Sequence, residues 1–176
     1  LGYDILNEPF IIPDRIDTGE GEDMATGFVS AQASDFLPDF YAQVTEAIRS
    51  VDREHIIFVE GDHFASDFDC LRGITDEQTA LTFHYYPTVW YDDLYDKEYD
   101  RREREQKFEE VFCRLIRIRE EIERPIQCRE AGYEIATNGM EDSLPLIELS
   151  FRLFQKYAVS FKQWSYNDAC FMGLVY

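Results

Sequence analysis

The sequence predicts an α/β fold, a five-stranded parallel sheet with helices that forms part of a (β/α)8 barrel. Short apolar runs rich in β-branched and aromatic residues alternate with segments of helical period, a pattern typical of parallel sheets with right-handed crossovers. Polar and aromatic residues suited to chemistry fall where these runs end, which is the arrangement of barrel enzymes. A complete barrel needs about 250 residues, so this chain of 176 residues would lack about three strands.

Five segments are predicted to be strands, because each is a short apolar run bounded by turn residues. They cover residues 1–6, 55–60, 79–85, 125–130 and 159–164. The candidate functional residues at or just beyond their ends are Glu8, Glu60, His84, Glu130 and Trp164. A doubly wound sheet would show the same alternation. No Gly-x-Gly-x-x-Gly follows a strand, however, so a dinucleotide site has no support.

The first helix is predicted from apolar residues at helical spacing. These residues are Phe40, Val44, Ile48 and Val51. Pro38 fits the first turn of this helix, with Ser34 or Asp35 available as its N-cap. The preceding residues 10–37 are polar and show no sustained period, which predicts a long loop over the end of the first strand.

Two further helices follow the third and fourth strands. The face of the first is marked by Phe108, Val111, Phe112, Leu115, Ile118 and Ile122. The charged residues 101–105 extend it as a solvated face. Ser143 is the expected N-cap of the second, which contains Leu144, Ile147, Phe151 and Phe154. Residues 65–77 leave room only for a turn or a brief helix.

The composition limits the partners. The chain is 45% hydrophobic and carries a net charge of −19, which disfavours nucleic acid and anionic membranes, since both need a basic face. A neutral polysaccharide meets no such objection. No apolar run approaches the roughly 18 residues of a membrane span. The four cysteines, which are widely spaced, are expected to be isolated thiols rather than a disulfide or metal framework: Cys70, Cys113, Cys128 and Cys170.

The chain begins at Leu1-Gly2-Tyr3, already within the first predicted strand. We therefore expect residues 1–176 to be one partial domain, the C-terminal portion of a longer protein. The cellular compartment cannot be read from this start. A barrel cut open exposes sheet edges, so the isolated chain is expected to associate with itself.

Two carboxylates at different strand ends suggest acid–base chemistry. Glu8, beside the amide of Asn7 and followed by Pro9, belongs to the first strand, and Glu130 to the fourth. Hydrolysis of a glycosidic bond requires such a pair. Glu60 competes with both on position alone, either as a supporting acid or as the partner of an arginine.

Four motifs in order resemble glycoside hydrolase family five, of the cellulase type. They are Asp4-Ile5-Leu6-Asn7-Glu8-Pro9, Phe83-His84-Tyr85-Tyr86-Pro87, Pro125-Ile126-Gln127-Cys128-Arg129-Glu130-Ala131-Gly132 and Gln163-Trp164-Ser165-Tyr166. The resemblance covers essentially the whole chain. It implies strands four to eight of a (β/α)8 barrel and a retaining hydrolase of β-1,4-linked glucan that uses no metal or cofactor. The resemblance favours an extracellular enzyme, and a cytoplasmic one stays open.

The resemblance also assigns the site residues. It implies that Glu8 is the general acid/base and Glu130 the nucleophile, with Asn7 bonding the sugar 2-hydroxyl. It places the Tyr86 hydroxyl against Glu130 and His84 in the cleft near the acid/base. Trp164 would be the platform under the sugar at the cleavage point.

The chain departs from the family pattern in two ways. Arg129 stands before the nucleophile where the family often has glycine. The family's strand-two arginine and other residues upstream of Asn7 are mostly absent from this chain, so residues 1–176 alone need not be active.

Several alternatives stay open. The substrate could be β-mannan or a β-glucoside, or the chain could be an inactive barrel fragment that acts as a carbohydrate-binding or interaction module. Trp90 and Tyr91 could line outer sugar subsites, and Tyr133 is either a cleft wall or packing. Four residues of one loop resemble a ligand cluster but are expected to be solvated polar residues: Asp62, His63, Asp67 and Asp69.

Overall fold

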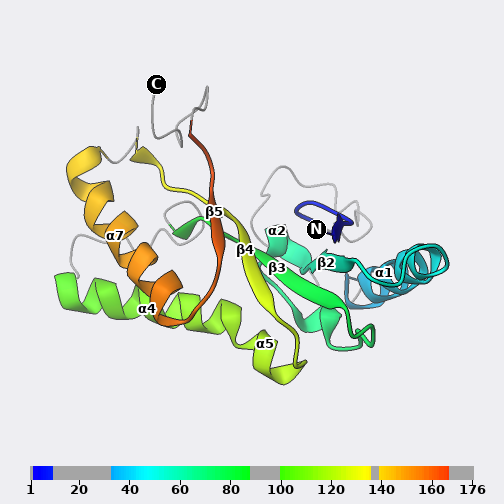
Figure 1. Cartoon of the computed structure of the whole chain (residues 1–176). Coiled ribbons are helices and arrows are strands. Elements are labelled where there is room, and N and C mark those ends of the chain that lie inside the picture. The colour runs from blue at the N-terminus through cyan, green and yellow to red at the C-terminus, as the bar shows by residue number, and fades with distance from the viewer. Residues whose placement is uncertain (1, 10–32, 88–99, 136–138, 167–176) are drawn as a thin grey trace, which may run out of the picture. The chain divides into compact units, whose positions relative to one another are not determined.

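A computed structural model describes residues 2–9, 33–87, 100–135 and 139–166 (Figure 1). The chain divides into two compact units, Leu1–Leu81 and Thr82–Tyr176. Strand β3 begins in the first unit and ends in the second. The order of strands in the sheet is β1-β2-β3-β4-β5, so every strand lies beside its neighbour in sequence. This arrangement, with helices between the strands, confirms the predicted α/β fold.

The first unit carries the elements that position Glu8 and Glu60. Its elements are β1 (Gly2–Asp4), α1 (Ala33–Arg49), β2 (Ile56–Glu60), α2 (Asp62–Ala65), the 3₁₀ helix η1 (Asp69–Leu71) and the start of β3 (Thr79–Tyr85). β1 and β2 are parallel, with Tyr3 opposite Ile57. The short helix η1 agrees with the turn or brief helix predicted within residues 65–77, whereas α2 begins earlier, at Asp62.

The second unit carries the elements that position Glu130. They are the end of β3, α4 (Arg101–Ile116), α5 (Ile118–Glu121), β4 (Ile126–Ala131), α7 (Met140–Lys156) and β5 (Phe161–Gln163). β4 and β5 are parallel, with Cys128 opposite Phe161 and a shift in register before Ala131. Helices α4 and α7 lie side by side in Figure 1. Between them and the strands, Phe112 contacts both Tyr85 and Phe154 edge to face.

The five strands fall where the apolar runs predicted them, although three are shorter than expected. β3 matches its predicted bounds, and every one of its residues is buried. Continuous burial explains why its sequence does not alternate between apolar and polar positions. β1 ends at Asp4, two residues earlier than predicted, so Asn7 and Glu8 lie on the connection that leaves the strand.

The predicted start of the first helix is wrong. α1 begins at Ala33, so Ser34 and Asp35 lie within the helix rather than at its cap, and Pro38 is an interior residue. The core face of α1 is set by Leu37 and Tyr41, each 1% exposed, while Val51 lies beyond the helix and is 86% exposed. Residues four apart share one face, so the helix must begin before Leu37 for both side chains to be buried. The predicted loop therefore ends earlier than residue 37, and most of it lies outside the described residues.

Ser143 does not cap the last helix as predicted. α7 begins at Met140 after Gly139, whose φ of 78° suits glycine. Ser143 is buried inside the helix. Of the predicted core residues, Ile147 and Phe154 are buried as expected, whereas Leu144 and Phe151 are exposed. The rest of the buried face is formed by Leu146, Leu149 and Leu153.

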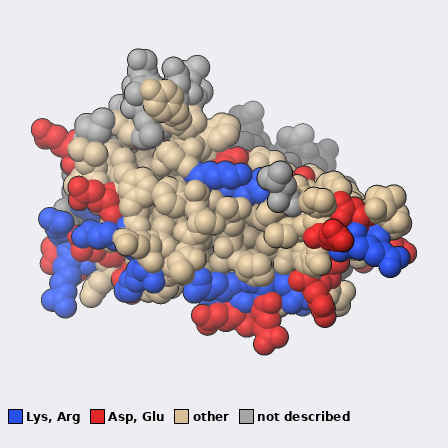
Figure 2. Space-filling view, in the orientation of Figure 1, with Lys and Arg blue, Asp and Glu red and all other residues tan. Residues whose placement is uncertain are grey.

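Helix α4 begins with the charged segment, as predicted. Asp100 and Glu103 form a capping box in which each side chain accepts a hydrogen bond from the other's backbone N–H. Acidic and basic side chains lie next to one another over α4 and α5 (Figure 2), and Arg101–Glu105 and Arg117–Glu121 are four residues apart. Such exposed pairs are worth little individually, which fits a solvated face.

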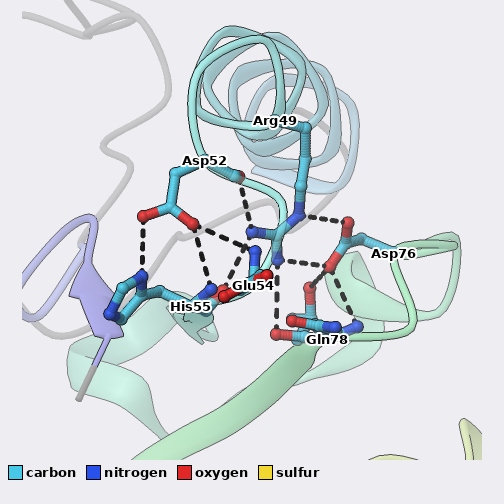
Figure 3. Close-up of polar contacts among 7 residues, drawn as sticks. Arg49, Asp52, Glu54, His55, Asp76 and Gln78 are labelled. Atoms are coloured by element: carbon cyan, nitrogen blue, oxygen red, sulfur yellow. Dashed lines mark hydrogen bonds and ion pairs between the residues drawn. The ribbon is translucent and has the colours of Figure 1, made fainter.

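In the first unit, a network of hydrogen bonds surrounds Arg49, the last residue of α1 (Figure 3). The guanidinium donates to both carboxylate oxygens of Asp76, at 2.8 and 2.9 Å, and to the backbone oxygen of His55 at 2.9 Å. The Asp76 carboxylate also accepts from Gln78 N–H, just before β3. Arg49 thus joins the end of α1 to the starts of β2 and β3.

Cys70, Cys113 and Cys128 are free thiols, as predicted. Cys170 lies outside the described residues. Over the described parts of the chain, we find no helix with both the length and the apolar character needed to cross a membrane.

Candidate active site

The side chain of Glu130, at the end of β4, lies against two residues of the β3 end. Tyr86 donates a hydrogen bond from Oη to Oε2 of Glu130 at 2.6 Å. His84 Nδ1 lies 3.4 Å from the same oxygen. The Glu130 side chain is 18% exposed, so the carboxylate is oriented by neighbours yet still reaches the surface.

Strand geometry explains why these two side chains meet one carboxylate. His84 and Tyr86 are two residues apart on extended chain, and alternate residues of a strand point to the same side. Their rings pack edge to face, with centroids 6.3 Å apart. Parallel strands bring their carboxyl ends to the same edge of the sheet, which places Glu130 of β4 beside them. His84 is fully buried, and its ring lies against the Glu130 carboxylate.

Gly132 allows a close approach behind Glu130. A Cβ at this position would lie 2.6 Å from Tyr86 Cε1 and 2.9 Å from the backbone oxygen of Trp164. Gly132 N–H donates to the backbone oxygen of Tyr85 at 3.1 Å, and Trp164 N–H donates to that of Ala131 at 2.8 Å. These two hydrogen bonds hold the chain after β4 between the ends of β3 and β5. Only glycine fits at position 132, because a Cβ would overlap with both neighbours.

Trp164 follows β5 and is 47% exposed. An indole half open to solvent is available to a ligand, whereas a core tryptophan would be covered. Trp90 and Tyr91, the predicted outer subsites, lie outside the described residues. Tyr133 is 2% exposed and packs with Ile135 and Ile147, which supports packing rather than a cleft wall.

The buried Cys128 thiol lies close to Glu130 but is not a candidate nucleophile. Its Sγ lies 3.0 Å from the backbone oxygen of Glu130. Burial raises the pKa of this thiol well above its ordinary value. A thiol held neutral is a poor nucleophile, so Cys128 does not compete with Glu130, the nucleophile that the sequence predicts.

In the first unit, Glu8 has an unusual backbone. Its φ is 47°, in the left-handed region, which costs about 1–2 kcal/mol for a residue with a Cβ. The side chain is partly buried, Asn7 before it is exposed, and Pro9 after it is buried. Such strain persists only where neighbouring contacts hold it.

Those contacts come from the end of β2. The Glu8 backbone N–H donates to Oε2 of Glu60 at 2.7 Å. Glu60 is fully buried, and both its backbone N–H and its backbone oxygen bond the hydroxyl of Tyr41. From its place at a strand end, the sequence offered Glu60 as a supporting acid or as the partner of an arginine. Nothing in the local sequence indicated its contact with Glu8, which lies 52 residues away.

The acidic loop after β2 differs from its prediction in one residue. Asp62 is 2% exposed rather than solvated, and Asp62 and Asp67 form a short antiparallel bridge. Gly61 permits this turn, because a Cβ there would lie 2.0 Å from the Asp67 backbone oxygen. Asp69 is exposed and pairs with Arg72. The chain therefore turns sharply directly after Glu60, and the bridge between Asp62 and Asp67 holds this turn.

A family model described as Cellulase (glycosyl hydrolase family 5) matches residues 1–169. Among curated proteins, a β-xylosidase of Phanerodontia chrysosporium is 26% identical over 148 residues, which cover 78% of this chain and 31% of that protein.

Solved structures show the same fold. An endoglucanase superposes with a TM-score of 0.69 at 14% identity, covering 98% of this chain and 53% of that one. Endoglucanase Cel5A from Thermotoga maritima superposes with a TM-score of 0.64 at 16% identity, covering 80% and 49%. These likenesses confirm the fold as part of a (β/α)8 barrel. The chain spans about half the length of these structures and less of the curated relative.

Proposed function

Because this chain belongs to glycosyl hydrolase family 5, we propose that its full-length protein is a retaining glycoside hydrolase of β-1,4-linked glucan. Glu8 is the acid/base of the proposed reaction and Glu130 is the nucleophile. The observation that carries the proposal is the pair of contacts to Glu130 Oε2, from the Tyr86 hydroxyl at 2.6 Å and from the His84 ring at 3.4 Å.

In the first step, a Glu130 oxygen attacks the anomeric carbon as the bond from that carbon to the leaving oxygen breaks. Glu8 gives its proton to the leaving oxygen, and a covalent glycosyl–enzyme ester forms. In the second step, Glu8 takes a proton from water, and the water oxygen attacks the anomeric carbon. Glu130 leaves as a carboxylate, and the product keeps its original configuration.

The neighbours of Glu130 suit this role. A phenol that donates to a carboxylate forms a short, charge-assisted hydrogen bond, which orients one oxygen and leaves the other available for attack. The mechanism requires the two carboxyl groups to lie about 5–5.5 Å apart in the active protein. Trp164, exposed after β5, offers an indole face to a sugar ring. Asn7, exposed beside Glu8, is available to the sugar 2-hydroxyl.

The sugar specificity of such an enzyme depends on the loops that form its subsites, so several glycans are candidate substrates. Cel5A of Thermotoga maritima was solved in complex with mannotriose and with cellobiose, and the curated relative is a β-xylosidase. We therefore expect a panel of cellulose, β-mannan, xylan and aryl β-glycosides to rank β-1,4-glucan first. Higher activity on mannan or on a small glycoside would revise the proposed substrate and leave the proposed mechanism unchanged.

The proposal is tested in the full-length protein with Glu130→Gly. Hydrolysis should fall by several orders of magnitude, and added azide should restore turnover as a glycosyl azide of inverted configuration. In the wild-type protein, NMR of the first product should show retention. Glu148→Gln, an exposed glutamate of α7, is the matched control and should leave activity unchanged. Undiminished turnover in Glu130→Gly, or an inverted product from the wild type, contradicts the proposal.

A further inference from the structure

We propose that Glu60 is a positioning residue, which orients the acid/base Glu8 by accepting a hydrogen bond from the Glu8 backbone N–H. The inference rests on the proposed function of Glu8 and adds to it a residue from a different strand. Glu60 does not touch substrate in this role; it acts through Glu8.

The acceptor is built into the end of β2. Glu60 is the last residue of that strand and is fully buried, and its Oε2 lies 2.7 Å from Glu8 N. A carboxylate accepting from a backbone N–H makes a stronger bond than a neutral acceptor would. Burying a carboxylate is costly unless it is hydrogen-bonded, so its use as an acceptor for Glu8 indicates more than packing.

Tyr41 holds Glu60 from the opposite side. Its hydroxyl donates to the Glu60 backbone oxygen at 2.8 Å and accepts from the Glu60 backbone N–H at 3.2 Å. Tyr41 is 1% exposed, and burial raises the pKa of its hydroxyl, which therefore stays protonated as a donor. Both backbone groups of Glu60 are thus fixed by one side chain of α1.

The segment that carries Glu8 is held at a second point. The Pro9 backbone oxygen accepts a hydrogen bond from Phe64 N–H at 3.2 Å. The Glu60 bond fixes the peptide before Glu8, and the Phe64 bond fixes the peptide after Pro9. Together they hold Glu8 at its positive φ, and φ decides where its Cα–Cβ bond points. A misplaced catalytic group by about 1 Å can cost about 100-fold in rate.

A positioning role and a merely structural role predict different kinetics. A general acid matters most when the leaving group is a poor one, because a good leaving group departs without a proton. A displaced Glu8 should therefore impair the cleavage of a phenyl glycoside and largely spare that of a 2,4-dinitrophenyl glycoside. A loosened fold should impair both by the same factor.

The experiment measures kcat/KM in the full-length protein for phenyl and 2,4-dinitrophenyl β-glycosides of its preferred sugar. Glu60→Met keeps the length of the side chain and removes the acceptor. We expect a loss of about 10- to 100-fold on the phenyl substrate and a much smaller loss on the activated one. Glu60→Gln keeps a neutral acceptor oxygen and should lose clearly less than Glu60→Met on the phenyl substrate. Glu46→Gln, an exposed glutamate of α1, is the matched control.

Tyr41→Phe is the second variant, for the case in which Glu60→Met does not fold. It leaves the Glu60 carboxylate in place, removes both bonds to the Glu60 backbone, and should give the same dependence on the leaving group with a smaller loss. Equal losses on both substrates in the variants that fold, or a loss in Glu60→Gln as large as in Glu60→Met, would overturn the inference.

Glu8→Ala separates this inference from the proposed function. If Glu8→Ala shows the dependence on the leaving group and the Glu60 and Tyr41 variants do not, only the positioning role is wrong. If Glu8→Ala itself shows no such dependence, the assignment of Glu8 as acid/base is wrong, and the inference falls with it.

Discussion

Tyr86 and Glu130, 44 residues apart in sequence, are joined by a hydrogen bond of 2.6 Å from the Tyr86 hydroxyl to Glu130 Oε2. The two residues come from the ends of consecutive strands, β3 and β4, and Gly132 lets the ring of Tyr86 lie directly against the chain that follows Glu130. The carboxylate is therefore oriented by a donor whose position depends on main-chain packing, not on a flexible loop.

Removing the Tyr86 hydroxyl should slow the chemistry without unfolding the protein. A hydrogen bond to a charged group is worth about 1.5–3 kcal/mol, so Tyr86→Phe should lower kcat/KM by about 10- to 100-fold. The matched control is Tyr157→Phe, which removes a hydroxyl that donates to Glu109 at 2.5 Å, between the end of α7 and α4. Steady-state kinetics and thermal unfolding of both variants check this. Wild-type kinetics in Tyr86→Phe would show that Glu130 needs no such donor.

A methyl group at Gly132 should disturb the site, whereas one at Gly73 should be harmless. Gly132→Ala would place Cβ 2.6 Å from the Tyr86 ring and 2.9 Å from the Trp164 backbone oxygen, while a Cβ at Gly73 has no heavy atom within 4 Å. We expect Gly132→Ala to lower Tm, since overpacking costs about 1–3 kcal/mol, and to lower kcat as Tyr86 is displaced. Calorimetry and kinetics of the pair test this, and equal behaviour of the two variants would contradict the close approach.

Truncating Trp164 should weaken substrate binding more than stability. The indole is 47% exposed, so Trp164→Ala removes about half of the buried surface that a core tryptophan would lose, and Tm should fall less than for a core tryptophan. If the ring is the platform under the sugar, kcat/KM should fall by about 2- to 12-fold, because aromatic packing contributes about 0.5–1.5 kcal/mol beyond the area buried. Trp164→Phe should recover part of the loss. A large drop in Tm with unchanged kinetics would instead make Trp164 a structural residue.

The bond between Arg49 and Asp76 should make the protein sensitive to acid. Hydrogen bonding to Arg49 lowers the pKa of Asp76 below its ordinary value of 3.8, so the unfolded chain binds the proton more readily than the folded one. The stabilisation is therefore present above about pH 4 and is lost as the pH falls through the folded-state pKa.

Breaking the charged pair should lower the free energy of unfolding by about 1–3 kcal/mol, so we expect Asp76→Asn to lower Tm at neutral pH. The variant should also show a smaller fall in Tm between pH 5 and pH 2.5 than the wild type. Glu105→Gln weakens the exposed pairs of Glu105 with Arg101 on α4 and with Arg152 on α7 and should change neither quantity appreciably. Thermal unfolding measured as a function of pH tests this prediction. If Tm of Asp76→Asn falls with acid as steeply as Tm of the wild type, the prediction is wrong.

Local sequence patterns were sufficient to predict which segments form helices and strands, but not where each helix begins. The buried run of β3 and the apolar spacing of α4 follow from side chains that must leave water, so their sequence periods predict them directly. The start of α1 was misplaced because Pro38 suggested a first turn, whereas the burial of Leu37 and Tyr41 requires the helix to begin earlier. Ser143 was misplaced for a similar reason, since the positive φ available to Gly139 lets α7 begin before it.

The sequence alone determined the α/β class, the positions of the strands along the chain and the candidate carboxylates, because each depends on residue types and periods within a short window. The family resemblance placed the Tyr86 hydroxyl against Glu130, as observed, whereas only the tertiary structure showed the bond between Glu8 and Glu60. The bonds from Tyr86 to Glu130 and from Glu8 to Glu60 join residues 44 and 52 positions apart. Such distant partners meet only when neighbouring strands pair in register and bring their ends to one edge of the sheet, and no local pattern encodes that meeting.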